Sequence, residues 1–435
     1  MLYRILKFIF SYTIRKYFLQ VNVLNEERIP LDKPVLLLPN HRSAFMDPIV
    51  VATQIKRTTF FLTRGESFNN PIAVKIFKRL KMIPIYRKEY DPDKVNQNQD
   101  IFENCYRLME EGGCLMIFPE GICQTKFLLA PLKTGSARIA LEAEDLNKFN
   151  LDIHLIPVGI NYSNPHRFRG NLTISIGEPI RAKDYEEAYR KEPWDAAVSL
   201  TEAVDRGLRN EIVILEDQSE IDTIHQIEEL VEKSDIDVPF AKEEWYTNRK
   251  AMLDFIQDAK AHDFQQWKDF RYQLSRYTSA KNKLGIVDQP HDLLTIVGQF
   301  IILVIGFPIF VLGFILHGPP FALTRWVSLK VVRRVDFMGS LVMVLGLLFF
   351  TIFGVLHTYI VYKLTLSNYI TIAFFVVWPY IGLITYGYWS LLHNWSSQLR
   401  WYRLGKRRRR LQHWITNEKM QLLSQLKSFE LKKAS

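Results

Sequence analysis

The stretch PVLLLPNHRSAFMDP, residues 34–48, joins a short apolar run to a polar loop that ends in proline. Residues 34–38 have the length and apolar character of a buried strand. Asp47 suits the N-cap of a helix and Pro48 suits its first position. The stretch therefore predicts a strand, a loop and a helix, which is the repeating unit of a layered α/β fold.

The same alternation continues to about residue 210. Further short apolar runs predict strands at 58–63, 83–86, 114–118, 153–158 and 172–176. Helical patterns predict helices at about 48–56, 71–80, 93–111 and 133–147. Residues 21–210 are therefore expected to form an α/β domain in which helices flank a sheet.

Polar side chains follow four of these strands. His41, Arg64, Arg87 and Glu120 each come where a predicted strand ends. In open α/β sheets, ligands bind outside the carboxyl ends of the strands. We therefore expect one histidine, one carboxylate and two arginines to share a crevice.

His41 and Asp47 allow two interpretations. A histidine and an aspartate at this spacing are common by chance, and a helix cap would account for Asp47 alone. The two side chains would not share a helix face. A loop histidine can nevertheless fold back, so that the carboxylate at the helix start holds the tautomer with a free basic nitrogen. The two roles of Asp47 are compatible.

The remainder of the chain differs in composition from the α/β region. We expect an interfacial amphipathic helix at 1–20, where apolar and basic residues mix, with packing on its own domain as the alternative. Residues 211–290 are acidic with helical periodicity, and predict a helical linker or insert without chemistry of its own.

Three uncharged segments, 293–316, 337–362 and 364–392, are each longer than the about 20 residues that cross a bilayer. If all three crossed, the basic residues between 325 and 334 and the basic tail would lie opposite the N-terminal domain, against the positive-inside bias. We therefore expect a re-entrant or interfacial segment at 291–336, a transmembrane hairpin at 337–393 and a basic cytosolic tail at 394–435. The α/β domain would then face the cytosol, at a bacterial inner membrane or the endoplasmic reticulum.

The net charge of +10 does not indicate nucleic acid. Seven basic residues lie between 400 and 410, directly after an apolar run, which is typical of a segment beside a membrane. Three cysteines in no CxxC pattern predict reduced thiols. A metal held by His41, Asp47 and Glu120 lacks the usual ligand spacing, so neither a metal nor a cofactor is expected.

Four ordered blocks over roughly residues 20–185 resemble the glycerol-phosphate and lysophospholipid acyltransferases, the superfamily of 1-acylglycerol-3-phosphate acyltransferase. The blocks are Asn40-His41 with Asp47, the apolar run that ends at Arg87, Phe118-Pro119-Glu120-Gly121 with the following 129–135, and 155–158. The resemblance implies a mixed sheet flanked by helices. It also implies acyl transfer from acyl-CoA or acyl carrier protein to a glycerol-phosphate acceptor beside membrane lipids.

The resemblance also implies roles for residues. His41 would be the general base and Asp47 would orient it. Arg87, with Arg64 and Lys133, would hold the acceptor phosphate, since guanidinium groups match phosphate oxygens. Glu120 would bind the glycerol moiety, and Gly121 would allow close approach of the backbone.

Two departures from the family pattern bear on the acceptor. Five residues rather than four separate His41 from Asp47, which resembles a subgroup of glycerol-3-phosphate acyltransferases with C-terminal membrane segments. The third block usually continues Thr-Arg-Ser, whereas this chain has Ile122-Cys123-Gln124. The leading hypothesis is synthesis of lysophosphatidate or phosphatidate. Lysophospholipid acylation or transacylation, and a catalytically silent lipid-binding protein, are the alternatives.

Overall fold

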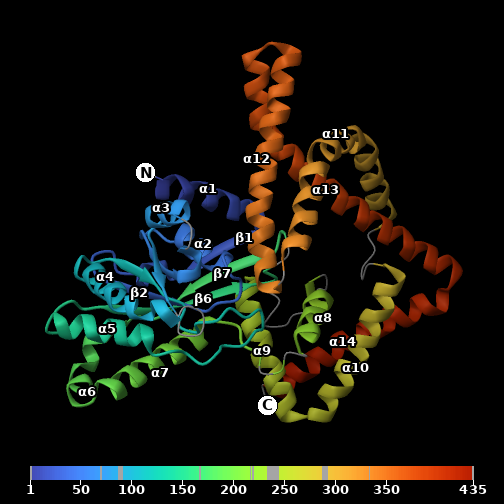
Figure 1. The fold of residues 1–435 in the computed structure, drawn as a ribbon. Coiled ribbons are helices and arrows are strands. Elements are labelled where there is room, and N and C mark those ends of the chain that lie inside the picture. The colour runs from blue at the N-terminus through green and yellow to red at the C-terminus, as the bar shows by residue number, and fades with distance from the viewer. Residues whose placement is uncertain are drawn as a thin grey trace. The chain divides into compact units, whose positions relative to one another are not determined.

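The computed structural model describes residues 2–68, 71–86, 92–165, 168–215, 217, 220–232, 244–286, 292–332 and 334–433. The chain divides into two compact units (Figure 1). The first comprises Met1–Glu216 with Ser328–Val344, and the second Asp217–Val327 with Leu345–Ser435. Each unit is described by itself.

The first unit is built on one sheet of eight strands. They are β1 (Gln20–Leu24), β2 (Val35–Pro39), β3 (Phe60–Arg64), β4 (Met82–Ile85), β5 (Cys114–Met116), β6 (His154–Tyr162), β7 (Asn171–Ile176) and β8 (Ile180–Arg181). The strand order is β1-β7-β6-β2-β5-β3-β4, and β8 pairs with β6. The pairings of β6 with β7 and β8 are antiparallel and the other pairings are parallel. The sheet is therefore mixed, as expected.

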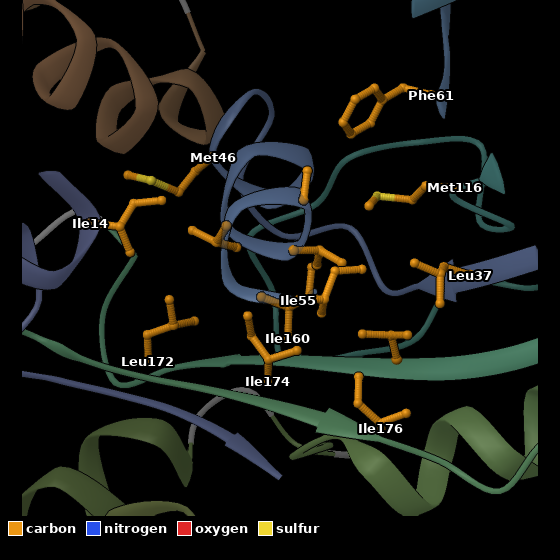
Figure 2. Close-up of a cluster of buried hydrophobic side chains, with 14 of the residues drawn as sticks. Ile14, Leu37, Met46, Ile55, Phe61, Met116, Ile160, Leu172, Ile174 and Ile176 are labelled. Atoms are coloured by element: carbon orange, nitrogen blue, oxygen red, sulfur yellow. The ribbon is translucent and has the colours of Figure 1, made fainter. Parts of the chain in front are cut away.

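Helices cover both faces of this sheet. They are α1 (Leu2–Tyr17), α2 (Met46–Gln54), α3 (Pro71–Arg79), α4 (Asn98–Glu110), α5 (Gly135–Leu146), α6 (Glu186–Lys191) and α7 (Pro193–Glu211). Val35 and Leu37 of β2 face a core shared with α1 and α2, part of which Figure 2 shows. The alternate residues Leu36 and Leu38 face a second core with α4, α5 and α7. Because side chains alternate along a strand, this central strand is buried on both sides.

The structure adds two strands that the sequence did not reveal, and corrects one helix start. β1 carries Gln20 and Asn22, and β8 has only two residues, so neither forms an apolar run. Helix α2 begins at Met46 with Phe45 as its N-cap. The prediction that Asp47 is the cap is therefore wrong, because Asp47 lies inside the first turn.

Four helices of the second unit form a bundle. They are α8 (Glu220–Glu232), α9 (Trp245–His262), α10 (Phe264–Leu284) and α14 (Arg409–Lys433), and each contacts α10 or α14. The rings of Trp267 and Phe270 on α10 pack against Phe429 of α14. The predicted insert is thus helical in its described residues. The segment expected as a basic tail contains α14, which supplies the fourth helix of that bundle.

Three further helices are long and apolar enough to cross a membrane, namely α11 (Leu293–Val331), α12 (Met338–Thr365) and α13 (Asn368–Arg407). Helix α11 contains Pro308, Pro319 and Pro320. Proline removes a backbone donor and bends a helix. The predicted break at residues 318–320 therefore falls inside a continuous helix.

Contacts of α11 show that its two halves run in opposite directions. The first half is antiparallel to α13, since Trp395 donates to the Ile296 carbonyl and the His317 ring packs on Trp378. The second half is antiparallel to α12, since His317 stacks on Phe350 and Thr324 lies against Gly346. Helices α12 and α13 are themselves antiparallel neighbours, so α11 reverses near residue 317, as the arch in Figure 1 shows. The number of membrane crossings stays a prediction.

Candidate active site

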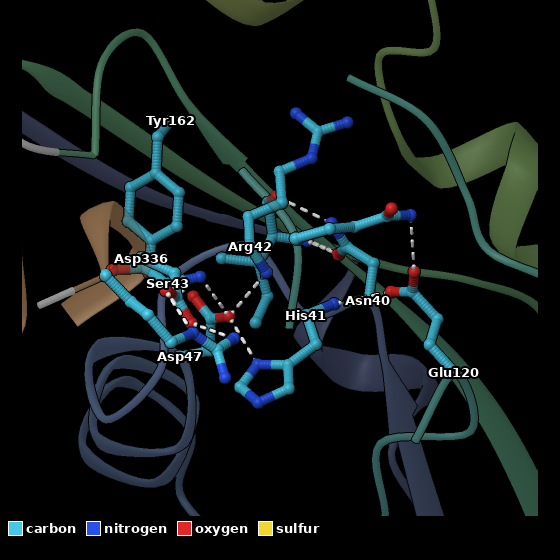
Figure 3. Close-up of polar contacts among 11 residues, drawn as sticks. Asn40, His41, Arg42, Ser43, Asp47, Glu120, Tyr162 and Asp336 are labelled. Carbon is cyan, nitrogen blue, oxygen red and sulfur yellow. Dashed lines mark hydrogen bonds and ion pairs between the residues drawn. The ribbon is translucent and has the colours of Figure 1, made fainter. Parts of the chain in front are cut away.

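His41 and Asp47 form a hydrogen-bonded pair at the carboxyl end of β2. The His41 Nδ1 atom lies 2.8 Å from Asp47 Oδ2 (Figure 3). The Asp47 side chain is fully buried, whereas 18% of the His41 side chain is exposed. The ring of His41 stacks on Phe118, with 4.1 Å between the ring centroids. The loop therefore folds back as the sequence suggested, and the carboxylate fixes the plane of the imidazole.

The Asp47 carboxylate accepts four hydrogen bonds. Besides the imidazole, Oδ2 accepts from the backbone N–H groups of Arg42 (2.7 Å) and Ser43 (2.8 Å). The other oxygen, Oδ1, accepts from the Tyr162 hydroxyl at 2.8 Å. Hydrogen bonds to a carboxylate favour its charged form. An acceptor of this kind assigns the His41 proton to Nδ1, which leaves Nε2 as the basic nitrogen.

Tyr162 comes from the carboxyl end of β6, next to β2 in the sheet. Burial raises the pKa of the Tyr162 hydroxyl well above its usual value, and the neighbouring Asp47 carboxylate adds to this. The hydroxyl therefore stays protonated and acts as a donor to Asp47. This residue was missed in the sequence, where it lies beyond the predicted strand 153–158. Its position after a strand beside the His41 strand was the signal that could have found it.

Asn40 fixes the loop to the sheet. Its Oδ1 accepts from the Ile160 backbone N–H at 2.6 Å, and its Nδ2 donates to the Ile160 carbonyl at 3.2 Å. The side chain is buried. It thus imitates a backbone group and prolongs the pairing of β2 with β6 by one residue. The loop that carries His41 begins from a rigid point.

Glu120 is also buried, but its described partners are backbone groups and one amide. Its Oε1 accepts from the His41 backbone N–H at 2.7 Å. Its Oε2 accepts from the Ala130 N–H at 3.0 Å and from the Gln124 side chain at 3.3 Å. Burial raises the pKa of Glu120, and the N–H donors of Ala130 and His41 oppose that rise. Glu120 therefore ties three loop segments together, and its contact with the acceptor stays a prediction.

Gly121 and Lys133 lie against each other. Gly121 has φ of 66°, in the left-handed region that favours glycine, and a Cβ there would come within 2.9 Å of Lys133 Cε. The Lys133 backbone N–H donates to the Pro119 carbonyl at 2.9 Å. The Lys133 side chain is exposed. Its ammonium group therefore lies beside the Glu120 loop, and its contact with a phosphate group stays a prediction.

Of the two arginines expected at the site, Arg64 lies within the described residues and Arg87 does not. Arg64 is the last residue of β3 and is partly exposed at the carboxyl edge of the sheet. Arg87 lies outside the described residues, two positions after β4. Strands β2, β3, β4 and β5 are parallel, so their carboxyl ends share one edge. Arg64 thus starts from the same edge as His41 and Glu120.

Comparison with known proteins identifies this region. Residues 20–161 match a family model described as Acyltransferase. These residues form an acyltransferase-family domain. The His41–Asp47 pair and the Glu120 loop lie inside it. The resemblance seen in the sequence is therefore confirmed for the domain.

The chain is 25% identical over 259 residues to glycerol-3-phosphate O-acyltransferase 1 of Saccharomyces cerevisiae, covering 55% of this chain and 32% of that protein. It is 27% identical over 132 residues to glycerol-3-phosphate O-acyltransferase 2 of the same yeast, covering 30% and 17%. An uncharacterised acyltransferase of Schizosaccharomyces pombe is 33% identical over 91 residues, covering 21% of this chain and 13% of that protein. The chain thus spans a third or less of the length of each of these relatives.

A solved structure, the 1-acyl-sn-glycerophosphate (LPA) acyltransferase PlsC from Thermotoga maritima, is similar at 21% identity with a TM-score of 0.33. That similarity covers 46% of this chain and 78% of the solved one.

Proposed function

We propose that the protein is a membrane-bound O-acyltransferase that acylates glycerol 3-phosphate or 1-acylglycerol 3-phosphate. The acyl donor would be acyl-CoA or acyl carrier protein, and no cofactor is required. The observation that carries the proposal is the His41–Asp47 pair, in which a buried carboxylate holds the imidazole at 2.8 Å. Similarity to the two yeast glycerol-3-phosphate O-acyltransferases supports this acceptor class.

The proposed reaction needs one general base. His41 Nε2 removes the proton from the acceptor hydroxyl while the hydroxyl oxygen attacks the thioester carbonyl carbon. An ester C–O bond forms, the C–S bond breaks, and the thiolate leaving group takes the proton back from the imidazolium. Asp47 stabilises the imidazolium, as in other His–Asp pairs. No covalent acyl-enzyme is required.

Basic residues that follow the neighbouring strands in the sequence suit a phosphate-bearing acceptor. Lys133 beside Gly121, Arg64 at the end of β3 and Arg87 after β4 are assigned to the phosphate group. Glu120 and Gly121 would shape the place of the glycerol moiety. Since Glu120 holds the backbone of His41 at 2.7 Å, it links acceptor binding to the position of the base.

The apolar surfaces support work at a membrane. Helix α1 packs Ile14 and Tyr17 into its own domain, while Ile5, Phe8 and Tyr12 are exposed on it. An exposed apolar stripe with basic neighbours suits an interfacial helix. We assign two crossings to α12 and α13 and a re-entrant path to α11, because its halves run in opposite directions. The acyltransferase domain then faces the cytosol together with the basic residues that follow α13.

The test compares acceptors side by side with the purified full-length protein. Acyl transfer from acyl-CoA is measured to glycerol 3-phosphate, 1-acylglycerol 3-phosphate and a lysophospholipid. We expect transfer to the phosphate-bearing glycerols, and a loss of about a thousandfold or more in His41→Ala. His154→Ala is the matched control, because this histidine begins β6 at the opposite edge and contacts the Asp152 carbonyl.

Three outcomes would contradict the proposal. Undiminished turnover in His41→Ala would remove the mechanism. Transfer to the lysophospholipid alone would move the protein to phospholipid remodelling. Absence of transfer to any acceptor, with either donor, would favour a lipid-binding role for the same fold.

A further inference from the structure

The first turns of α12 belong to the same compact unit as the acyltransferase domain. We call Asp336–Met343 the foot of α12; it comprises the end of the 3-10 turn Val335–Phe337 and the first residues of α12. Met343 is 2% exposed and lies in the same core cluster as Met46 and Val50 of α2. Val342 packs against that cluster. The foot therefore packs in the same hydrophobic core as α2, the helix that carries Asp47.

An aromatic contact joins the foot to the His41 loop. The ring of Phe337 meets the ring of Phe45 edge to face, with 5.4 Å between their centroids. Such pairs contribute beyond the area they bury. Phe45 is the residue before α2 and stands two positions from Asp47. The contact therefore fixes the point at which the loop becomes the helix.

A buried carboxylate joins the foot to the Glu120 loop. Asp336 is 6% exposed and receives two N–H groups from Arg334, at 3.1 and 2.8 Å. Asp336 lies close enough to Cys123 to influence the pKa of its thiol. Burial raises the pKa of this thiol, and the carboxylates of Asp47 and Asp336 add to the rise. A raised pKa keeps the thiol neutral beside the Asp336 carboxylate.

Cys123 stands where the family block usually carries a basic residue. Beside it, the Gln124 backbone N–H donates to the His41 carbonyl at 3.0 Å. The two loops are therefore joined directly, and the foot contacts the first of them through the Phe45–Phe337 ring pair. Asp336 of the foot lies near Cys123 on the second loop. A neutral side chain at this position allows the acidic side chain of Asp336 to lie nearby.

We propose that the foot of α12 is a positioning element of the active site, in which Phe337 and Asp336 hold the His41 loop and the Cys123 loop in register. Its kinetic consequence rests on the proposed acyl transfer. These residues act through His41 and touch neither acceptor nor donor. The membrane hairpin would then set the geometry of the base as well as anchoring the protein.

The kinetic test uses the full-length protein with Phe337→Ala, Asp336→Ala and Asp336→Asn. We expect kcat to fall about tenfold in both alanine variants, since small misplacements of a base are costly. The KM for the acceptor should stay within about twofold, because no acceptor contact is removed. Val335→Ala and Val344→Ala flank the foot at exposed positions and are the matched controls.

Double variants of contacting residues distinguish a positioning role from a general loss of folding. The double variant Phe45→Ala, Phe337→Ala should be no less active than the less active of the two single variants, since each substitution removes the same contact. Cys123→Ser keeps a donor to Asp336 and should retain more activity than Cys123→Ala. Losses that multiply in the Phe45–Phe337 pair, or kcat unchanged in both alanine variants, would overturn the inference.

A second readout needs no activity. Amide hydrogen exchange by mass spectrometry should speed up in peptides covering 40–47 and 120–124 in Asp336→Ala and Phe337→Ala. Peptides of α5, on the other face of the sheet, should be unchanged. Unchanged exchange in both loops would refute the positioning role even in an active enzyme. Faster exchange in a protein without acyl transfer would refute only the proposed function.

Discussion

The loops after β2 and β5 each place one buried carboxylate at the same edge of the sheet, yet the two carboxylates have different partners. Asp47 accepts from the imidazole of His41 and the hydroxyl of Tyr162 as well as from backbone. Glu120 accepts from the backbone of His41 and Ala130 and from an amide. Asp47 therefore fixes the orientation and tautomer of the His41 ring, and Glu120 fixes the position of the His41 backbone.

The largest effect should follow from Asp47→Asn. The amide keeps the volume but removes the negative charge and offers Nδ1 of His41 a donor, which favours the wrong tautomer. We expect kcat to fall by about 10³ to 10⁴, as for aspartates that orient a catalytic histidine. Steady-state kinetics measure it. Asp152→Asn is the control, because Asp152 pairs with Arg181 and Lys183 away from this edge. A loss of less than about tenfold would mean that Asp47 only shapes the loop.

Glu120→Gln should have a smaller kinetic effect and a visible effect on stability. One of the N–H groups now bound by Glu120 would face an amide donor, at a cost of about 1–3 kcal/mol. We expect a lower melting temperature and about a tenfold loss in kcat as His41 shifts. Glu178→Gln, a change at an exposed carboxylate, is the control. A loss as large as that of Asp47→Asn would give Glu120 a direct chemical role.

The pH dependence of stability gives a second test of Glu120 with the same Glu120→Gln variant. The pKa of Glu120 is raised in the folded protein by burial, so the folded state holds its proton to higher pH than the unfolded chain. The resulting stabilisation is fully present below the unfolded pKa and is lost as pH rises through the folded pKa. Within that window the melting temperature of the wild type should fall with pH more steeply than that of Glu120→Gln. Parallel slopes would contradict the raised pKa.

The smallest effect should come from Tyr162→Phe. This change removes one of four donors to Asp47, at a cost of about 1 kcal/mol, which is roughly a fivefold change. We expect kcat to fall by about that factor while the acceptor KM stays constant. Tyr17→Phe is the control, because the buried Tyr17 hydroxyl has no hydrogen-bond partner among the described residues. Equal losses in both variants would show that packing, not the donor, is responsible.

Much of the site at the carboxyl edge of the sheet was predictable, because the direction of the strands decides which residues lie there. His41, Arg64 and Glu120 each follow a short apolar run, and parallel strands bring such positions to one side. The left-handed φ of Gly121 suits glycine, whereas the close approach of its backbone to an acceptor stays a prediction. The N-cap at Asp47 was wrong, since Phe45 can begin the helix and frees Asp47 for the ring.

Contacts between distant segments could not be predicted from local pattern. Tyr162 and Asp336 reach the site from 115 and 213 residues beyond Asp47 and Cys123 respectively, and neither lies in a motif. β8 has two residues and β1 alternates with polar ones, so neither carries an apolar signal. The reversal of α11 is seen from the packing of His317 on Phe350 and Trp378. The number of apolar residues in a segment does not predict such contacts.

The place of α14 in the bundle also bears on the order in which the protein forms. The strands of the sheet and most of the helices that cover it lie within the first 211 residues, so most of that sheet can pair while later segments are still being synthesised. Helices α8, α9 and α10 lack their partner until residues 409–433 have been made, which is after three apolar helices have emerged. Until then Trp267 and Phe270 have no Phe429 to cover them. Assembly of the bundle is therefore a late step, dependent on the successful placement of α11, α12 and α13.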